Sequence, residues 1–229
     1  LSAQNTRTRL LDNLYNLTQT QDVSSTALIL HTASLTALAY HPEEVTVAAL
    51  PTIHNILSYI LAGARTVTVP VVVLKSLLGV FNVILPIAST NSTIRAAFPT
   101  LSTAQILAKS QSLVVTQADL LQDLISLIQS DSVVGENTFS STENGDIRVK
   151  LQRLYNYDFG ASLAIDGAET PLEANAGADI FSVQLNSIAR NVDLTVSILQ
   201  LQYSNLLLNS LRLISHPVLL QVQDAGNVC

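Results

Sequence analysis

Residues 102–129 read STAQILAKSQSLVVTQADLLQDLISLIQ, and this stretch decides the first half of the fold. It opens on Ser102 and Gln105 in capping-box spacing, which is typical of a helix N-terminus. Asp119 and Asp123 fall on one side of the helix that this pattern predicts. The opposite side carries an apolar stripe made of Ile106, Leu113, Leu120, Leu124 and Leu127.

Shorter helices are predicted upstream of this stretch. Leu10, Leu14 and Leu17 share one helix face, and a cap-like Ser/Thr cluster precedes the next apolar pattern. That second helix should end before His41-Pro42, because a residue before proline is pushed out of the helical region. The predicted helices cover residues 10–17, 24–40, 42–63 and about 70–85. Short loops between them favour an antiparallel helical array.

The chain after about residue 135 has a different period. Asn144-Gly145 is a hairpin-turn dipeptide, and apolar residues then alternate with polar ones, which is typical of half-buried strands. The alternation covers residues 147–152, 181–186, 192–198 and 218–222. Helices followed by strands indicate an α+β fold, in which an N-terminal antiparallel helical array precedes a β-sandwich-like region.

The change of period also sets the predicted domains. We expect a helical subdomain over residues 1–133 and a β-rich subdomain over 134–229, the latter incomplete at its C-terminal end. Residues 1–130 hold six acidic and six basic side chains, so the net charge of -6 resides in the later part. That part is therefore expected to be the more polar, solvent-facing or partner-facing one.

Composition excludes several classes of protein. The 229 residues are 48% apolar and 12% charged, which disfavours disorder. Eleven basic residues face 17 acidic ones without a basic cluster, so we expect no nucleic-acid partner. One Cys cannot staple a small domain, and the four His show no metal-ligand spacing. We therefore expect no metal and no cofactor.

No motif for catalysis is visible. The nucleophile motif Gly-x-Ser-x-Gly is absent, and no glycine-rich phosphate loop occurs. Glu43 and Glu44 are adjacent, and adjacent helical residues do not face one another. A favourable helix start explains this acidic pair more simply than acid–base chemistry. We predict no catalytic residue, and a triad dispersed over the fold remains the enzymatic alternative.

Candidate modification sites are few. Asn16-Leu-Thr18 and Asn91-Ser-Thr93 are acceptor triplets for N-glycosylation. Cys229 is the last residue, and a lone thiol in a secreted protein suggests a disulfide to a segment outside this chain. The chain contains no Met, which suggests a processed or truncated piece of a larger protein.

Residues 67–88 form the most apolar stretch, about 20 residues long, which is the length that spans a bilayer. Lys75 and Asn82 lie in its middle, and Pro70 and Pro86 lie near its ends. A mid-span lysine costs about 3 kcal/mol on insertion scales. The pattern therefore favours a buried bundle helix over contact with a membrane.

The order of features resembles the extracellular GAIN domain of the receptor-like polycystins and egg-jelly-receptor proteins. His41-Pro-Glu-Glu-Val-Thr is similar to the family's proline-acid-acid helix start. The second similar stretch consists of the end of the predicted helix, residues 127–136, followed by a predicted strand over residues 147–153. The third is Ile214-Ser-His-Pro-Val-Leu-Leu-Gln-Val-Gln-Asp-Ala-Gly-Asn227, which looks like the family's strand and turn.

This resemblance implies a helical subdomain followed by the opening strands of a β-sandwich. The family's autoproteolysis site needs paired Cys and Trp and a His-Leu-Thr or His-Leu-Ser sequence. This chain has no Trp, one Cys and neither tripeptide, so no cleavage residue is carried over.

We therefore expect a non-enzymatic extracellular module of a large cell-surface protein, with the ciliary membrane as one location that the resemblance implies. It would hold protein partners, such as a channel subunit or a surface filament, and meet a membrane only through segments outside this chain. The alternatives are a secreted helical carrier of an apolar ligand and a subunit of an extracellular filament. An enclosed apolar cavity would favour the carrier.

Overall fold

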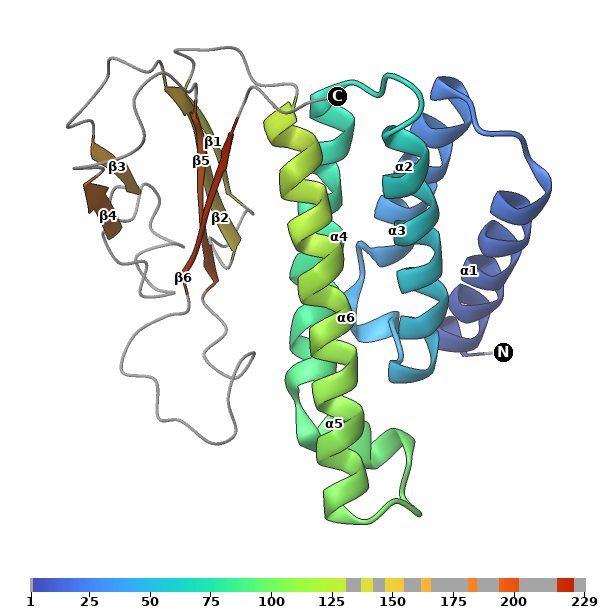
Figure 1. The fold of residues 1–229 in the computed structure, drawn as a ribbon. Helices are drawn as coiled ribbons and strands as arrows, with labels where there is room; N and C mark the ends of the chain where they lie inside the picture. The colour runs from blue at the N-terminus through green and yellow to red at the C-terminus, as the bar shows by residue number, and fades with distance from the viewer. Residues whose placement is uncertain are drawn as a thin grey trace. The chain divides into compact units, whose positions relative to one another are not determined.

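The computed structural model describes residues 2–130 continuously and then six separate strands (Figure 1). The chain divides into two compact units, and the first boundary between them falls after Leu127. The first unit is built from helices. Only Ile147 and Val149 have described side chains among the strands, and both are buried.

Six α-helices and two 3₁₀ turns make up residues 2–130. They are α1 (Ala3–Thr20), α2 (Ser25–Ala39), η1 (Pro42–Glu44), η2 (Val47–Ala49), α3 (Leu50–Ala64), α4 (Val71–Ser89), α5 (Asn91–Ala97) and α6 (Thr103–Ser130). Side chains cap the start of three of these helices. Ser2 and Ser24 accept the backbone N–H of Asn5 and Ala27, so each satisfies an N–H that the first turn leaves free.

The capping box predicted for the long helix is confirmed. The Ser102 N–H donates to Gln105 Oε1 at 2.9 Å, and the Gln105 N–H donates to Ser102 Oγ at 3.3 Å. These reciprocal bonds satisfy two backbone donors at the start of α6.

The predicted helix over 42–63 begins later than expected. Pro42–Glu44 form a 3₁₀ turn, and Val45 and Thr46 are extended before α3 begins at Leu50. β-branched residues favour extended backbone, and these two interrupt the helix that the acidic pair was expected to open. The predicted helix over 70–85 instead continues to Ser89 and includes Pro86. The short helix α5 was not predicted.

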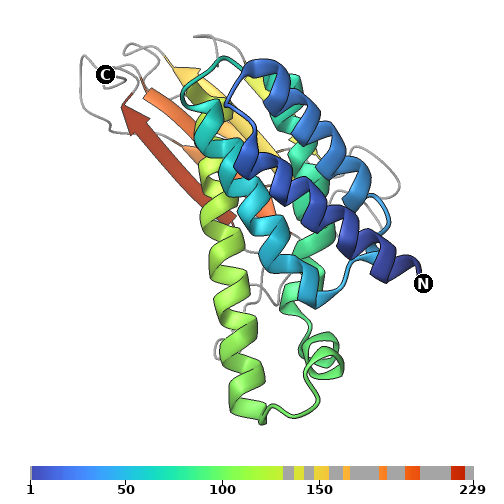
Figure 2. The same ribbon diagram turned by 90° about the vertical axis from the view of Figure 1, so that its right-hand side faces the viewer.

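The core of this unit is aliphatic. Helix α2 packs on α1, α3 and α4, and α1 packs on α3 (Figures 1 and 2). Gly63 allows α3 to approach α2 closely, because a Cβ there would lie 2.9 Å from a methyl of Leu28. The largest fully buried side chains are Phe81, Leu11, Leu28, Leu35, Leu50, Ile53, Ile56, Leu57, Ile60, Leu61 and Leu77.

The described strands pair in two antiparallel groups. Strands β1 (Asn137–Ser141), β2 (Ile147–Leu154), β5 (Leu194–Leu201) and β6 (Val218–Asp224) pair in that order, and β3 (Ser162–Ile165) pairs with β4 (Phe181–Gln184). In register, Ser140 faces Val149, and Val149 faces Leu199. The predicted Asn144-Gly145 turn lies outside the described residues.

The expected fold class, α+β with a β-sandwich-like region, is wrong. Residues 2–130, the continuous part that the structure describes, are mostly helical and hold no strand, so the described fold is a helical array. A sandwich requires two sheets whose inner side chains interdigitate. Period-2 alternation is a local pattern and does not specify that packing. The predicted boundary between residues 133 and 134 lies outside the described residues.

Candidate functional site

A shallow groove of about 570 Å³ runs between α2 and α4. It is widely open to solvent, and its lining contains no Asp, Glu, Lys or Arg. The lining residues are Ala33, Thr36, Ala37, Tyr40, His41 and Ser76. Such a groove can accept an apolar surface, because it offers small side chains and one exposed aromatic ring.

Helix α2 has no Asp, Glu, Lys or Arg on either of its sides. One side is buried in the core through Leu28, Leu35 and Ala39. The opposite side is exposed although it is mostly apolar, with Leu30 58% and Tyr40 70% exposed. A helix without a charged side usually has all its sides buried. This solvent-facing side, which we call the α2 outer face, comprises Leu30, Ala33, Ser34, Ala37 and the adjoining Tyr40.

Helix α4 continues this surface. Ser76 lines the groove, and Val72 on the preceding turn is 73% exposed. A Cβ added at Gly79 would meet no atom within 4 Å, so this position is open as well. Val72, Ser76 and Gly79 are thus small or aliphatic, and the half-buried Lys75 is the charged residue of α4 that lies among them.

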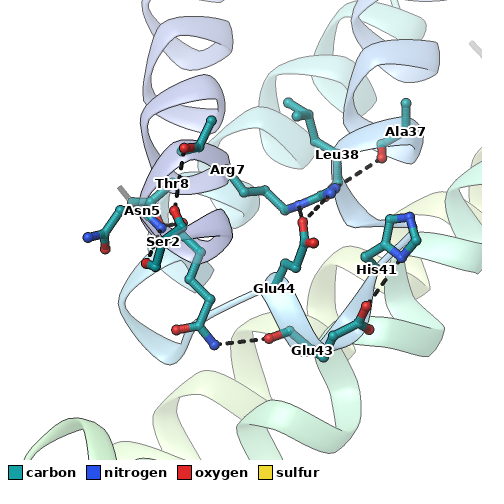
Figure 3. Close-up of polar contacts among 11 residues, drawn as sticks. Ser2, Asn5, Arg7, Thr8, Ala37, Leu38, His41, Glu43 and Glu44 are labelled. Atoms are coloured by element: carbon teal, nitrogen blue, oxygen red, sulfur yellow. Dashed lines mark hydrogen bonds and ion pairs between the residues drawn. The ribbon is translucent and has the colours of Figure 1, made fainter.

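A polar cluster, which we call the Arg7 junction, lies at the C-terminal end of α2 (Figure 3). Arg7 of α1 donates through Nε to Glu44 Oε2 at 2.7 Å, and its Nη2 forms an ion pair with the same carboxylate. Its Nη1 donates to the carbonyl oxygens of Leu38 at 2.5 Å and Ala37 at 3.3 Å. The guanidinium thus bonds two carbonyls at the end of α2, of which that of Ala37 also accepts the Tyr40 N–H.

The same junction has an exposed rim. His41 Nδ1 lies 3.3 Å from Glu43 Oε1 (Figure 3). The Tyr40 ring meets His41 edge-on, with centroids 5.2 Å apart. The Gln4 side chain donates to the Glu43 carbonyl at 2.9 Å. These contacts tie α1 to the 3₁₀ turn that follows the groove.

A second polar cluster lies inside the helical unit and is buried. Gln117 of α6 has no exposed surface, and its Nε2 lies 3.2 Å from both His54 Nε2 of α3 and the Ile84 carbonyl of α4. Burial lowers the pKa of His54 to about 4. We call this arrangement the Gln117 bridge. The sequence does not reveal it, since His54 has no His or carboxylate partner at helical spacing.

A second buried titratable group is His31 of α2. Its ring packs against Tyr59 with centroids 5.7 Å apart, and its Nδ1 has no hydrogen-bond partner. Burial lowers the pKa of His31. Among the described residues, no group of three His, Cys, Asp or Glu could hold a metal.

The two predicted glycosylation triplets lie on different helices and differ in exposure. Asn16 is exposed on α1, but the Thr18 of its triplet is buried and donates to the Tyr15 carbonyl at 2.7 Å. Asn91 is exposed at the first residue of α5, and Thr93 is exposed beside it. Cys229 lies outside the described residues.

The apolar stretch at 67–88 forms most of α4. Its buried residues include Leu77, Phe81 and Ile84, so this helix contributes to the core of the helical unit. Within the described residues, two segments, Val47–Ala64 and Val71–Ser89, are long and apolar enough to cross a membrane by length and composition. Core helices of soluble proteins also meet that criterion.

Neither a protein-family model nor a curated protein matches this chain. The described surfaces and the sequence resemblance given above are therefore the basis on which a function can be proposed. The signal for the groove was present in the sequence, because residues 25–39 contain no Asp, Glu, Lys or Arg. An isolated helix pattern could not show which side of that segment would face solvent.

Proposed function

We propose that this chain is a non-enzymatic protein-interaction module, which binds a protein partner through the α2 outer face. One observation carries the proposal: α2 is uncharged and mostly apolar on the side that faces solvent as well as on the side that faces the core. Contiguous exposed apolar surface on a folded protein commonly marks an interaction site.

The partner we propose is an uncharged helix of another protein with small apolar side chains. No Asp, Glu, Lys or Arg occurs in α2, so a charged partner would lose its water without gaining a counter-charge. Ala33, Ala37 and Ser76 let a second backbone approach closely. Tyr40 at the end of the groove supplies the rigid aromatic contact that commonly anchors an interface.

The experiment places a photo-reactive amino acid at the exposed Ser34 and identifies the crosslinked protein, which is then purified and titrated against the chain. We expect the Ala33→Arg variant to weaken binding at least about 10-fold, because it puts an unpaired charge in the groove. Ala118→Arg is the matched control, since Ala118 is also an exposed alanine within a long helix, α6. Equal binding by both variants would contradict the proposed face.

The same variant also tests two other binding partners for the α2 outer face. If the purified chain self-associates in sedimentation and Ala33→Arg abolishes this, the surface belongs to a filament or oligomer and the partner is a second copy. If lipid co-purifies and is lost in Ala33→Arg, the chain is a carrier of apolar ligands. Either result would replace the proposed partner helix.

We further propose an extracellular, cell-surface location, supported by the GAIN-like resemblance and by exposed Asn16 and Asn91. A ciliary membrane and a channel subunit remain the location and partner that this resemblance favours. Expression through a secretory route, followed by glycosidase treatment and mass spectrometry, tests this. We expect a glycan at Asn91, where both Asn91 and Thr93 are exposed, and none in Asn91→Gln. Occupancy at neither asparagine in the native protein would count against the location.

A further inference from the structure

The Gln117 bridge joins three helices through one amide group. Gln117 Nε2 has two hydrogens, and it lies 3.2 Å from the Ile84 carbonyl oxygen and 3.2 Å from His54 Nε2. The carbonyl can only accept a hydrogen bond, so the amide nitrogen, and not the amide oxygen, must face it. The same nitrogen therefore donates its second hydrogen to His54.

This geometry determines the state of the histidine. Because Gln117 Nε2 is only a donor, His54 Nε2 must accept, and the imidazole must be neutral with its proton on Nδ1. A protonated ring would point a second N–H at the amide hydrogens. Rotation of the amide would not restore the bridge, because Gln117 Oε1 would then face the Ile84 carbonyl oxygen.

We propose that the Gln117 bridge is an acid-sensitive lock, which holds α6 and α4 on α3 while His54 is neutral and releases them when His54 takes a proton.

Among the described residues, no charged group lies where it would stabilise a protonated His54 ring. Burial is the cause that depresses the His54 pKa, with no contribution from a neighbouring charge. Asp12 of α1 is exposed and bonded to Thr52, and His31 of α2 is itself buried. The remaining titratable groups on α3 and the helices around it are exposed or half-buried, namely Arg7, Arg9, Tyr15, Tyr59, Lys75, Lys109, Asp119, and Asp123, which pairs with Arg65.

A second polar contact between α6 and α4 lacks any titratable group. Ser110 Oγ donates to the Ala88 carbonyl at 2.8 Å and is buried. Ser110 and Gln117 are two helical turns apart on α6, and their acceptors are one turn apart on α4. Ser110 thus provides an internal control, because it links the same two helices at every pH.

The test is hydrogen exchange on the full chain at pH 7 and pH 5, corrected for the intrinsic exchange rate and followed by mass spectrometry. With a closed-state pKa of about 4 for His54 and an ordinary one near 6.5 when α6 opens, the opening constant should rise about 20-fold. We expect this rise in peptides of α6 and α4, and a smaller one in α1.

Two variants separate a lock from general destabilisation. His54→Gln keeps an amide acceptor without a titrating ring, and we expect its opening constant to rise less than about 3-fold over the same range. Ser110→Ala should open more at both pH values yet keep the roughly 20-fold ratio. The proposal would be overturned if the opening constant of His54→Gln still rose about 20-fold from pH 7 to pH 5, or if every helix lost protection equally.

A measurement on the unaltered protein covers the case in which His54→Gln fails to fold. The ring resonances of His54 should titrate near pH 4, well below the ordinary range, and exchange in α6 should already accelerate as the pH falls from about 6.5 toward that value. Titration of His54 near its ordinary pKa of about 6.5 while α6 stays protected would also overturn the lock.

Discussion

The Arg7 junction and the Gln117 bridge both hold helices together through side-chain hydrogen bonds, but the first uses charged groups and the second uses neutral ones. Both link one helix to the backbone carbonyl of another through a side chain that also contacts a third element. The junction does so with a full ion pair whose side chains are 15% and 27% exposed. The bridge does so with neutral groups, and Gln117 is completely buried.

Burial explains the difference. A charged pair at a partly exposed edge keeps some of its hydration, so its hydrogen bonds are not offset by a large desolvation penalty. Inside the helical unit the same charges would cost several kcal/mol, whereas a neutral amide and imidazole need only matched donors and acceptors. The bridge is imperfect, because Gln117 Oε1 has no partner. The comparison predicts that the bridge is the more sensitive of the two to loss of a side chain and to acid.

Removal of Gln117 should have the largest effect. Gln117→Ala leaves a buried cavity and deprives His54 Nε2 of its donor, so we expect a loss of about 3 kcal/mol in the free energy of unfolding. Urea unfolding at pH 7 measures it. Gln117→Met fills the cavity without the hydrogen bonds, and a loss close to that of alanine would show that the polar contacts, rather than the volume, dominate.

Acid should act next, through His54. Its folded pKa of about 4 lies below the ordinary value of 6.5, so the folded state binds fewer protons than the unfolded state. Stability is therefore unaffected above about pH 6.5, falls as the pH decreases toward about 4, and levels off below that. Between pH 7 and pH 5 this histidine alone should remove about 2 kcal/mol. His31 acts in the same direction.

Urea unfolding at the two pH values measures this loss, and His54→Gln provides the reference without a titrating ring. If the two proteins lose equal stability between pH 7 and pH 5, His54 is not the group responsible.

Much of the helical part follows from the sequence alone. The α6 stripe and its capping box depend on residues a few positions apart, and such local patterns determine local structure. The start of α3 did not follow, because Glu44 turns toward Arg7, which is 37 positions away in the chain. The β-sandwich-like region was wrong for a related reason: alternation describes one strand, whereas a sandwich depends on which faces cover one another.

The candidate surfaces were harder to predict. The uncharged sequence of α2 is visible at once, but the sequence does not show that one side of this helix stays in solvent. The Gln117 bridge joins residues 63 and 33 positions apart, and neither His54 nor Gln117 carries a recognisable spacing. Long-range polar contacts of this kind need the three-dimensional arrangement.

Loss of Arg7 should have a smaller effect than loss of Gln117. Arg7→Ala leaves Glu44 without its counter-charge and removes the guanidinium bonds to the Ala37 and Leu38 carbonyls, so we expect a loss of about 1–2 kcal/mol. Arg7→Lys keeps the charge but cannot bond the carboxylate and both carbonyls at once, and it should fall in between. Thermal unfolding at low and high salt measures both. A loss in Arg7→Ala above that of Gln117→Ala would reverse the comparison.

The smallest effect is expected at the rim of the junction. His41 and Glu43 face each other at 3.3 Å, but their side chains are 51% and 67% exposed. Exposed pairs of this kind are screened by solvent, so Glu43→Gln should change the free energy of unfolding by less than about 0.5 kcal/mol. The Gln4 contact is to the Glu43 backbone carbonyl and survives the substitution. Urea unfolding of Glu43→Gln and Arg7→Ala, measured side by side, compares their losses in the free energy of unfolding. A loss in Glu43→Gln as large as that in Arg7→Ala would mean that burial does not determine the strength of these contacts.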